Sequence, residues 1–136
     1  MSHKPKPLPE GVHTVVLGMG DLNGLLRGKR IPADNWNNIC ASGMAMANAI
    51  FAIDMNCDVW DTPYANFETG YPDLYVMPTG DVYPIPWEEG VVFSFGEAVG
   101  HDRLPVPIDP RAALVRVLQK ALDMGFEPRV GTELEF

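Results

Sequence analysis

Two glutamates near the C-terminal end of the chain, Glu133 and Glu135, have the type and spacing that a metal site needs. Side chains of a strand alternate between its two faces, so this pair would point one way while Leu134 and Phe136 point the other. Like charges about 6 to 7 Å apart repel each other, and a divalent cation converts that repulsion into binding. Taken alone, the pair fits an ordinary solvent-facing strand surface better than a metal site.

The segment that precedes these glutamates carries the clearest helical signal in the sequence. Asp109 suits a helix N-cap and Pro110 the first helical position, so a helix is predicted to begin at residue 110. Gly125 ends it, and the stretch 126–136 that follows is predicted to be the β-strand that carries the glutamate pair. The apolar face of this helix is formed at helical spacing by Leu114, Val117, Leu118, Ala121 and Leu122.

The N-terminal part of the chain predicts a hairpin and a helix behind a disordered leader. The leader, residues 1–12, contains lysines and prolines but few apolar side chains. An apolar run at 13–17 ends in turn-forming residues, and 22–31 alternates loosely, which together indicate a β-hairpin. Residues 33–42 place apolar side chains on one helical face and end at Gly43, a typical helix C-cap.

The middle of the chain predicts strands separated by one long loop. The apolar run 49–53 ends at Asp54 and is interpreted as a strand buried on both faces, whereas 56–72 is rich in turn-forming residues. The prolines within 83–87 favour an extended edge segment. Further strands are predicted at 74–77 and 91–95. The whole pattern is typical of an α+β fold in which a helix packs on a mainly antiparallel sheet.

The charge of the chain argues against two classes of partner. Its 136 residues hold 18 Asp and Glu against 10 Lys and Arg, a formal net charge of −8. Such a surface repels phosphate backbones and anionic headgroups, so neither nucleic acid nor a membrane is expected as a partner. The sequence has no signal-peptide-like start and no apolar run of about 18 residues, which favours a cytoplasmic location.

Five segments of the sequence form a characteristic ordered set along the chain. They are Asp21-x-x-Gly24-x-x-Arg27-Gly28-Lys29, Gly70-Tyr71-Pro72-Asp73, Pro86-Trp87, Asp109-Pro110-Arg111 and Gly131-x-Glu133-x-Glu135-Phe136. Together they resemble the glutamine synthetase family. The resemblance implies an N-terminal β-grasp domain over 13–106, a mixed sheet with one packed helix. Residues 107–136 would then be the first helix and strand of a truncated catalytic domain.

The resemblance also implies a reaction and its cofactors. Members of this family join glutamate to ammonia or an amine, and ATP first forms a γ-glutamyl phosphate that the nitrogen attacks. Two Mg²⁺ or Mn²⁺ ions organise the phosphates, and the family pattern gives Glu133 and Glu135 the role of metal ligands. The remaining metal ligands and the contacts to ATP and glutamate would lie beyond residue 136, so the chain alone is expected to be inactive.

The family pattern further implies a homo-oligomer in which this domain completes the active site of a neighbouring subunit. Asp54 would sit at the ammonium or amine site, with Trp60 as an aromatic wall and Asp73 near the same interface. Ammonia-using members usually carry Asp-Gly-Ser-Ser at this place, whereas here the run is Asp54-Met55-Asn56-Cys57-Asp58. This run resembles the branch that acts on larger amines, such as polyamines or small alkylamines. The structural alternatives are that Asp54 caps a strand end and that Asp73 belongs to a turn.

Two further alternatives stay open on the sequence. The chain could be a stand-alone β-grasp module with an assembly or regulatory role and no catalysis, because a fold does not determine a function. The basic run Arg27-Gly28-Lys29-Arg30 invites a phosphate-binding interpretation but lacks the glycine spacing of a P-loop, so a charged hairpin rim is the favoured interpretation.

Overall fold

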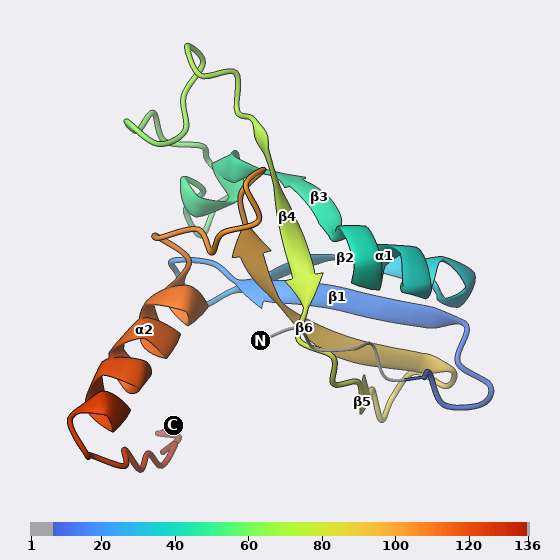
Figure 1. The fold of residues 1–136 in the computed structure, drawn as a ribbon. Helices are drawn as coiled ribbons and strands as arrows, with labels where there is room; N and C mark the ends of the chain where they lie inside the picture. The colour runs from blue at the N-terminus through green and yellow to red at the C-terminus, as the bar shows by residue number, and fades with distance from the viewer. Residues whose placement is uncertain (1–6, 136) are drawn as a thin grey trace.

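The computed structural model describes residues 7–135, which form one mixed β-sheet with two helices (Figure 1). The strand order is β2-β1-β6-β4-β3, with β5 pairing on β6. β1 and β6 run parallel and every other pair is antiparallel. The elements are β1 Thr14–Gly20, β2 Leu26–Pro32, η1 Ala33–Asn35, α1 Trp36–Ser42, β3 Met44–Ala47, η2 Asn48–Phe51, β4 Asp73–Pro78, β5 Tyr83–Pro84, β6 Val91–Val99 and α2 Pro110–Asp123. The α+β class predicted from the sequence is confirmed.

The predicted β1–β2 hairpin forms, although β1 continues through Gly20 beyond the expected end at residue 17, and two glycines permit its geometry. Gly24 adopts φ +77° in the connecting turn, a backbone conformation that favours glycine. Gly28 pairs with Gly18 across the hairpin, and a Cβ at Gly28 would lie 2.0 Å from the carbonyl oxygen of Leu17. A side chain at position 28 would therefore push the two strands apart.

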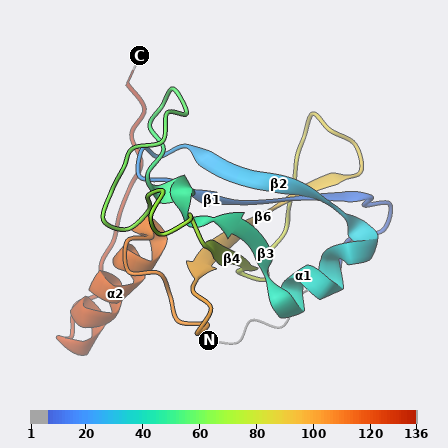
Figure 2. The same cartoon turned by 90° about the horizontal axis from the view of Figure 1, so that it is seen from above.

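Helix α1 covers one side of the sheet and closes the core. Trp36 is only 2% exposed, and Gly43 ends the helix with φ +82°, as the sequence predicts. Seen from above, α1 and α2 lie at different ends of the sheet (Figure 2). Although β2 and β3 are the outer strands of the sheet order, Lys29 of β2 donates a hydrogen bond to the Ala45 carbonyl of β3 at 2.8 Å. The sheet therefore curls enough for one lysine side chain to span its two edges.

The expected strand at 49–53 is wrong, because this segment forms the 3-10 turn η2 and the strand lies just before it, as β3. Asn48 starts the turn: its backbone N–H donates to the Pro72 carbonyl and its side chain donates to the Tyr64 carbonyl. These two bonds tie the start of η2 to the long loop. The apolar side chains of Ile50 and Phe51 therefore enter the core from a 3-10 helix and not from a β-strand.

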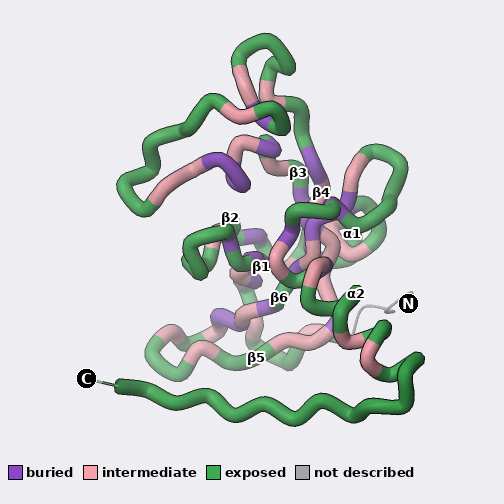
Figure 3. The backbone as a smooth tube through the Cα atoms, turned by 90° about the vertical axis from the view of Figure 1, so that its left-hand side faces the viewer, coloured by how far each residue is buried: buried purple, intermediate pink, exposed green. Residues whose placement is uncertain are grey.

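The expected strand at 126–136 is also wrong for the residues that the structure describes. Residues 126–135 belong to no helix or strand and are exposed along their whole length (Figure 3). Val130 is 93% and Leu134 is 88% exposed. A strand needs a neighbour to bond its backbone groups, and the described residues place none beside this segment. Residue 136 lies outside the described part of the chain.

The ordered fold begins before the boundary that was expected at residue 13. Leu8 and Val12 pack against a buried cluster of Val15, Trp36 and Val92, while residues 1–6 of the expected leader lie outside the described residues. The larger core cluster contains ten residues from the sheet, η2 and the segment before α2. Within the described range, no helix is long and apolar enough to cross a membrane.

Candidate functional site

The loop after η2 is organised by the Asp54 carboxylate. Its Oδ1 accepts hydrogen bonds from the backbone N–H groups of Asn56 and Asp58 at 2.8 and 3.0 Å. Its Oδ2 accepts a hydrogen bond from the indole Nε1 of Trp60 at 3.3 Å. A carboxylate has about four acceptor positions, so three bonds leave room for one more donor. Asp54 therefore shapes the loop and still offers an acceptor to a ligand.

The electrostatics of the loop favour the charged form of Asp54. The hydrogen bond from the Asp58 backbone is the largest cause that lowers the pKa of the Asp54 carboxyl. The bonds from Trp60 and Asn56 and the positive charge of Arg27 act in the same direction, against partial desolvation. A charged carboxylate beside an aromatic ring is a suitable environment for an ammonium group.

Side chains of the β1–β2 hairpin hold this loop through hydrogen bonds. Arg27 donates from Nη2 to the Asp54 carbonyl and from Nη1 to the Cys57 Sγ, both at 3.2 Å. Asn23 donates from Nδ2 to the Ile53 carbonyl at 2.8 Å. The loop and the hairpin are separated by a long stretch of chain, so these contacts are tertiary.

Arg27 is itself fixed by a buried carboxylate, Asp21. The Arg27 Nε lies 2.8 Å from Asp21 Oδ2, and the Asp21 side chain is 0% exposed. Asp21 Oδ1 also accepts bonds from the backbone of Asn23 and Leu25, each at 2.8 Å. Burial raises the pKa of Asp21, but the bonds from Arg27, Leu25 and Asn23 together outweigh it, so the pKa of this carboxyl is lowered.

The loop exposes several large apolar side chains among polar ones. Met55 is 71% exposed, Trp60 64% and Phe67 89%. Phe67 packs edge-on against Tyr71, with ring centroids 5.5 Å apart. These side chains are available for contact with a ligand or a partner.

Asp73, the third predicted residue of this region, is the first residue of β4 and lies opposite Ala47 of β3. Its side chain is exposed and forms no hydrogen bond or ion pair with the residues that the structure describes. The structure thus joins Asp54 directly to Trp60 and joins Asp73 to neither.

Glu133 and Glu135 lie in the exposed C-terminal tail, away from the loop (Figures 1 and 3). Among residues 7–135, no group of three or more His, Cys, Asp or Glu side chains is placed to hold a metal ion. Mg²⁺ prefers about six oxygen ligands, so two carboxylates on an exposed tail do not fit such an ion by themselves.

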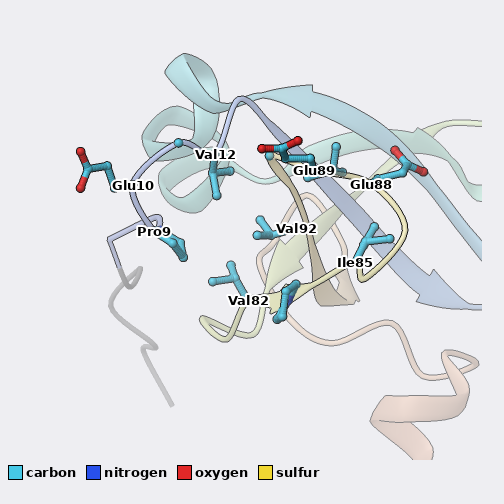
Figure 4. Close-up of a pocket in the computed structure, with 12 residues that line it drawn as sticks. Pro9, Glu10, Val12, Val82, Ile85, Glu88, Glu89 and Val92 are labelled. Carbon is cyan, nitrogen blue, oxygen red and sulfur yellow. The ribbon is translucent and has the colours of Figure 1, made fainter.

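A pocket of about 420 Å³ lies elsewhere, between the segment before β1 and the β5–β6 region (Figure 4). Val12, Val82, Ile85 and Val92 line it, and Glu89 stands at its rim. None of the predicted site residues lines this pocket.

The role of Arg27 was missed by the sequence analysis, which treated the basic run as a charged rim. A local signal was present, because Asp21 and Arg27 flank a glycine-containing turn and so face each other across a hairpin. Their contact to the loop had no signal, since residues this far apart in the sequence meet only in the folded chain.

Comparison with known proteins gives a consistent group of relatives. No protein-family model matches the chain. The chain is 30% identical over 124 residues to type-1 glutamine synthetase 2 of Dictyostelium discoideum, which covers 90% of this chain and 24% of that protein. It is 30% identical over 128 residues to γ-glutamylethanolamide synthetase GlnA4 of Streptomyces coelicolor, covering 92% of this chain and 28% of that protein. This chain is a relative of the glutamine synthetase family.

A third relative within the family is γ-glutamylputrescine synthetase PuuA of Escherichia coli, 32% identical over 118 residues, covering 85% of this chain and 25% of that protein. The chain thus spans about a quarter of the length of the curated relatives that it matches. The glutamine synthetase resemblance proposed from the five sequence segments is confirmed by these relatives.

Solved structures support the same fold. A GmaS complex with ADP matches with a TM-score of 0.67 at 24% identity, over 85% of this chain and 24% of that one. A glutamine synthase homologue matches with a TM-score of 0.71 at 20% identity, over 89% of this chain and 29% of that one. At these identities the likeness concerns the fold alone.

Proposed function

We propose that this chain is the N-terminal part of an ATP-dependent ligase that joins glutamate to an amine, and that the 54–60 loop contributes to the amine site. The observation that carries the proposal is the Asp54 carboxylate held against the Trp60 indole. A carboxylate beside an aromatic ring attracts an ammonium ion and can accept its proton before the nitrogen attacks.

The relatives support an amine larger than ammonia. Three of them are named for ethanolamine, isopropylamine and putrescine, whereas others are named glutamine synthetase. The exposed Trp60 side chain suits an amine with a carbon chain, because apolar side chains gain free energy when they cover alkyl groups. The loop would do this work in the active site of a neighbouring subunit of a homo-oligomer.

Glu133 and Glu135 are proposed as ligands of Mg²⁺ or Mn²⁺ once further oxygen or nitrogen ligands complete the coordination shell. Such ions, when bound, neutralise the charge that develops on a transferring phosphoryl group. The described residues alone do not provide that shell. The isolated chain is therefore proposed to be inactive.

The test is an amide-forming assay on the gene product that contains this chain. Glutamate, ATP and Mg²⁺ are combined with ammonium, ethanolamine, isopropylamine or putrescine, and both phosphate release and the γ-glutamyl product are measured by mass spectrometry. Phosphate release that requires an amine and glutamate supports the proposal. Its absence with all four nitrogen donors, in a folded protein that binds ATP, would defeat it.

One observation favours a second candidate, a non-catalytic assembly module. Helix α2 exposes apolar side chains that a partner protein would cover, among them Leu114, Val117 and Leu122, which are 58%, 66% and 54% exposed. If the isolated chain binds an intact relative in size-exclusion chromatography while no amine supports catalysis, the module is the better description. If no complex forms, this second candidate fails.

A further inference from the structure

The Arg27 guanidinium connects three groups that belong to two separate parts of the fold. Its Nε donates to Asp21 Oδ2 at 2.8 Å, within the hairpin. Its two terminal nitrogens donate to the Asp54 carbonyl and the Cys57 Sγ, both at 3.2 Å, within the loop. A planar guanidinium holds its donors in fixed directions, so fixing one edge against Asp21 also fixes the direction of the other two.

The Asp21 side of this connection is rigid. Asp21 is fully buried and accepts backbone bonds from both Asn23 and Leu25, while the Arg27 side chain is 20% exposed. Breaking a buried ion pair leaves a charge without a partner, which costs far more than breaking an exposed pair. The hairpin therefore presents the guanidinium to the loop in one orientation.

The loop side lacks a core of its own. Met55, Asn56, Cys57 and Asp58 are all exposed, so little buried apolar surface holds this stretch in place. Segments with few buried contacts open easily unless polar bonds restrain them. Hydrogen bonds within the loop shape it, and those from Arg27 and Asn23 tie it to the hairpin.

The backbone at Cys57 gives an independent sign that the loop is restrained. Cys57 has φ +69°, in the left-handed region that non-glycine residues rarely occupy. Such a residue keeps this conformation only when its surroundings determine it. The Cys57 N–H donates to the Asp54 carbonyl at 3.1 Å, and the same carbonyl accepts from Arg27.

We infer that Arg27 is a positioning residue for the amine site: it holds the 54–60 loop so that the Asp54 carboxylate and the Trp60 indole keep their relative placement. This inference rests on the proposed role of the loop in amine binding. Arg27 does not touch the amine itself, and it acts through the Asp54 carbonyl and Cys57. The first arginine of the basic run thus binds groups within this chain.

The first test compares R27K with R30K in the ¹⁵N-labelled 136-residue chain. Lysine at position 27 keeps a positive charge for Asp21 but reaches only one of the three acceptors. Arg30 lies on the same strand and pairs with Glu88 instead, so R30K is the matched control. The readouts are the Trp60 indole resonance and hydrogen exchange at the Asn56 and Asp58 amides.

R27K is expected to move the Trp60 indole resonance toward that of a solvent-exposed tryptophan and to speed exchange at both amides by about tenfold, which corresponds to about 1.4 kcal/mol. The Trp36 indole and the amides of β1 and β6 should stay unchanged, as should all loop signals in R30K. Loop signals in R27K that match the wild type would overturn the inference.

A second variant covers the case in which R27K does not fold. C57A removes one acceptor of Arg27 and leaves the buried pair with Asp21 intact. It should speed exchange at Asn56 and Asp58 by about threefold, a part of the effect expected for R27K. Unchanged exchange at these two amides in C57A would overturn the inference, as wild-type loop signals in R27K would.

Kinetics of the longer gene product separate this inference from the proposed function. R27K should raise the KM for the amine about tenfold while the KM values for ATP and glutamate change less than twofold. A released loop with an unchanged KM for the amine would overturn the positioning role. A wild-type protein without amine-dependent turnover would defeat the proposed function, whereas the exchange data would still report on the contact itself.

Discussion

The buried carboxylate of Asp109 accepts a hydrogen bond from the backbone N–H of Ala98 at 2.8 Å, which fastens the start of α2 to strand β6. The other oxygen of Asp109 accepts from the Arg111 N–H at 2.9 Å and so caps the helix. The segment that was expected to open a second domain is thus bonded to the sheet of the first. One side chain performs both tasks.

Replacing Asp109 with alanine should lower the free energy of unfolding by about 2 to 4 kcal/mol. The helix loses its N-cap, which costs about 1 kcal/mol, and the buried Ala98 N–H loses its acceptor, which costs about 1 to 3 kcal/mol. Urea unfolding followed by circular dichroism measures the change. D123A, at the exposed far end of α2, should stay within about 0.5 kcal/mol of the wild type. Equal stability of D109A and D123A would contradict this account.

Asp21 should make the stability of the fold depend on acid pH. The pKa of this carboxyl is lowered in the folded chain from its ordinary value of 3.8, so the unfolded chain takes up a proton first as the pH falls. The stabilisation is therefore complete above about pH 5 and is lost as the pH falls through the lowered folded pKa.

The variant D21N tests this pH dependence. At pH 7 it should lose about 3 kcal/mol, because the Arg27 charge is left without its partner. Between pH 5 and pH 2 its urea midpoint should fall less steeply than that of the wild type. Asp54 and Glu88 also have lowered pKa values and are present in both proteins, so the difference between the two curves isolates Asp21. Parallel curves would show that Asp21 does not contribute.

Asp54 and Trp60 should affect amine use in different ways in the gene product that contains this chain. D54N should lower kcat/KM for the amine about 100-fold, because an amide cannot take up the ammonium proton. W60F keeps an aromatic ring but loses the indole N–H, and it should mainly raise the KM for the amine. D58N is the control, since the Asp58 side chain forms no hydrogen bond with the described residues. Steady-state kinetics with varied amine would refute the site if D54N and D58N behaved alike.

The exposed apolar face of α2 should make the isolated chain self-associate. Leu114, Val117 and Leu122 leave a contiguous stripe uncovered, and stripes of this kind bury themselves against other surfaces. Sedimentation velocity should show oligomers at concentrations of about 100 μM, and the double variant L114E/V117E should return the chain to a monomer. K120Q, also on α2, should not change the association. A wild-type chain that stays monomeric at this concentration would disprove the prediction.

Local signals explain which elements could be predicted from the sequence. The Asp109-Pro110 start of α2 and the Gly43 end of α1 depend on neighbouring residues, and both form as predicted. The hairpin also forms, but its turn lies at 21–25 rather than at the expected 18–21. Strand β3 carried no such signal, because its Met-Ala-Met-Ala sequence contains no β-branched or aromatic residue.

The errors have a common physical cause, which is that strands depend on partners. The runs at 49–53 and 126–136 have strand-like composition, but a short apolar run fits a turn as well as a strand until its neighbours are known. The same limit applies to the site. Asp54 and Trp60 were identified by resemblance and lie together, whereas the contact between Arg27 and the loop required the folded chain.

The parallel pairing of β1 with β6 has a consequence for biosynthesis. Val15 of β1 pairs with Val92 of β6, which leaves the ribosome much later. The β1–β2 hairpin can form early, but the opposite edge of β1 has no partner until β6 emerges. During that interval an unpaired hydrophobic edge is open to wrong pairing, and contacts distant in sequence form slowly. Translation speed through the stretch between these two strands should therefore influence how much of the protein folds correctly in the cell.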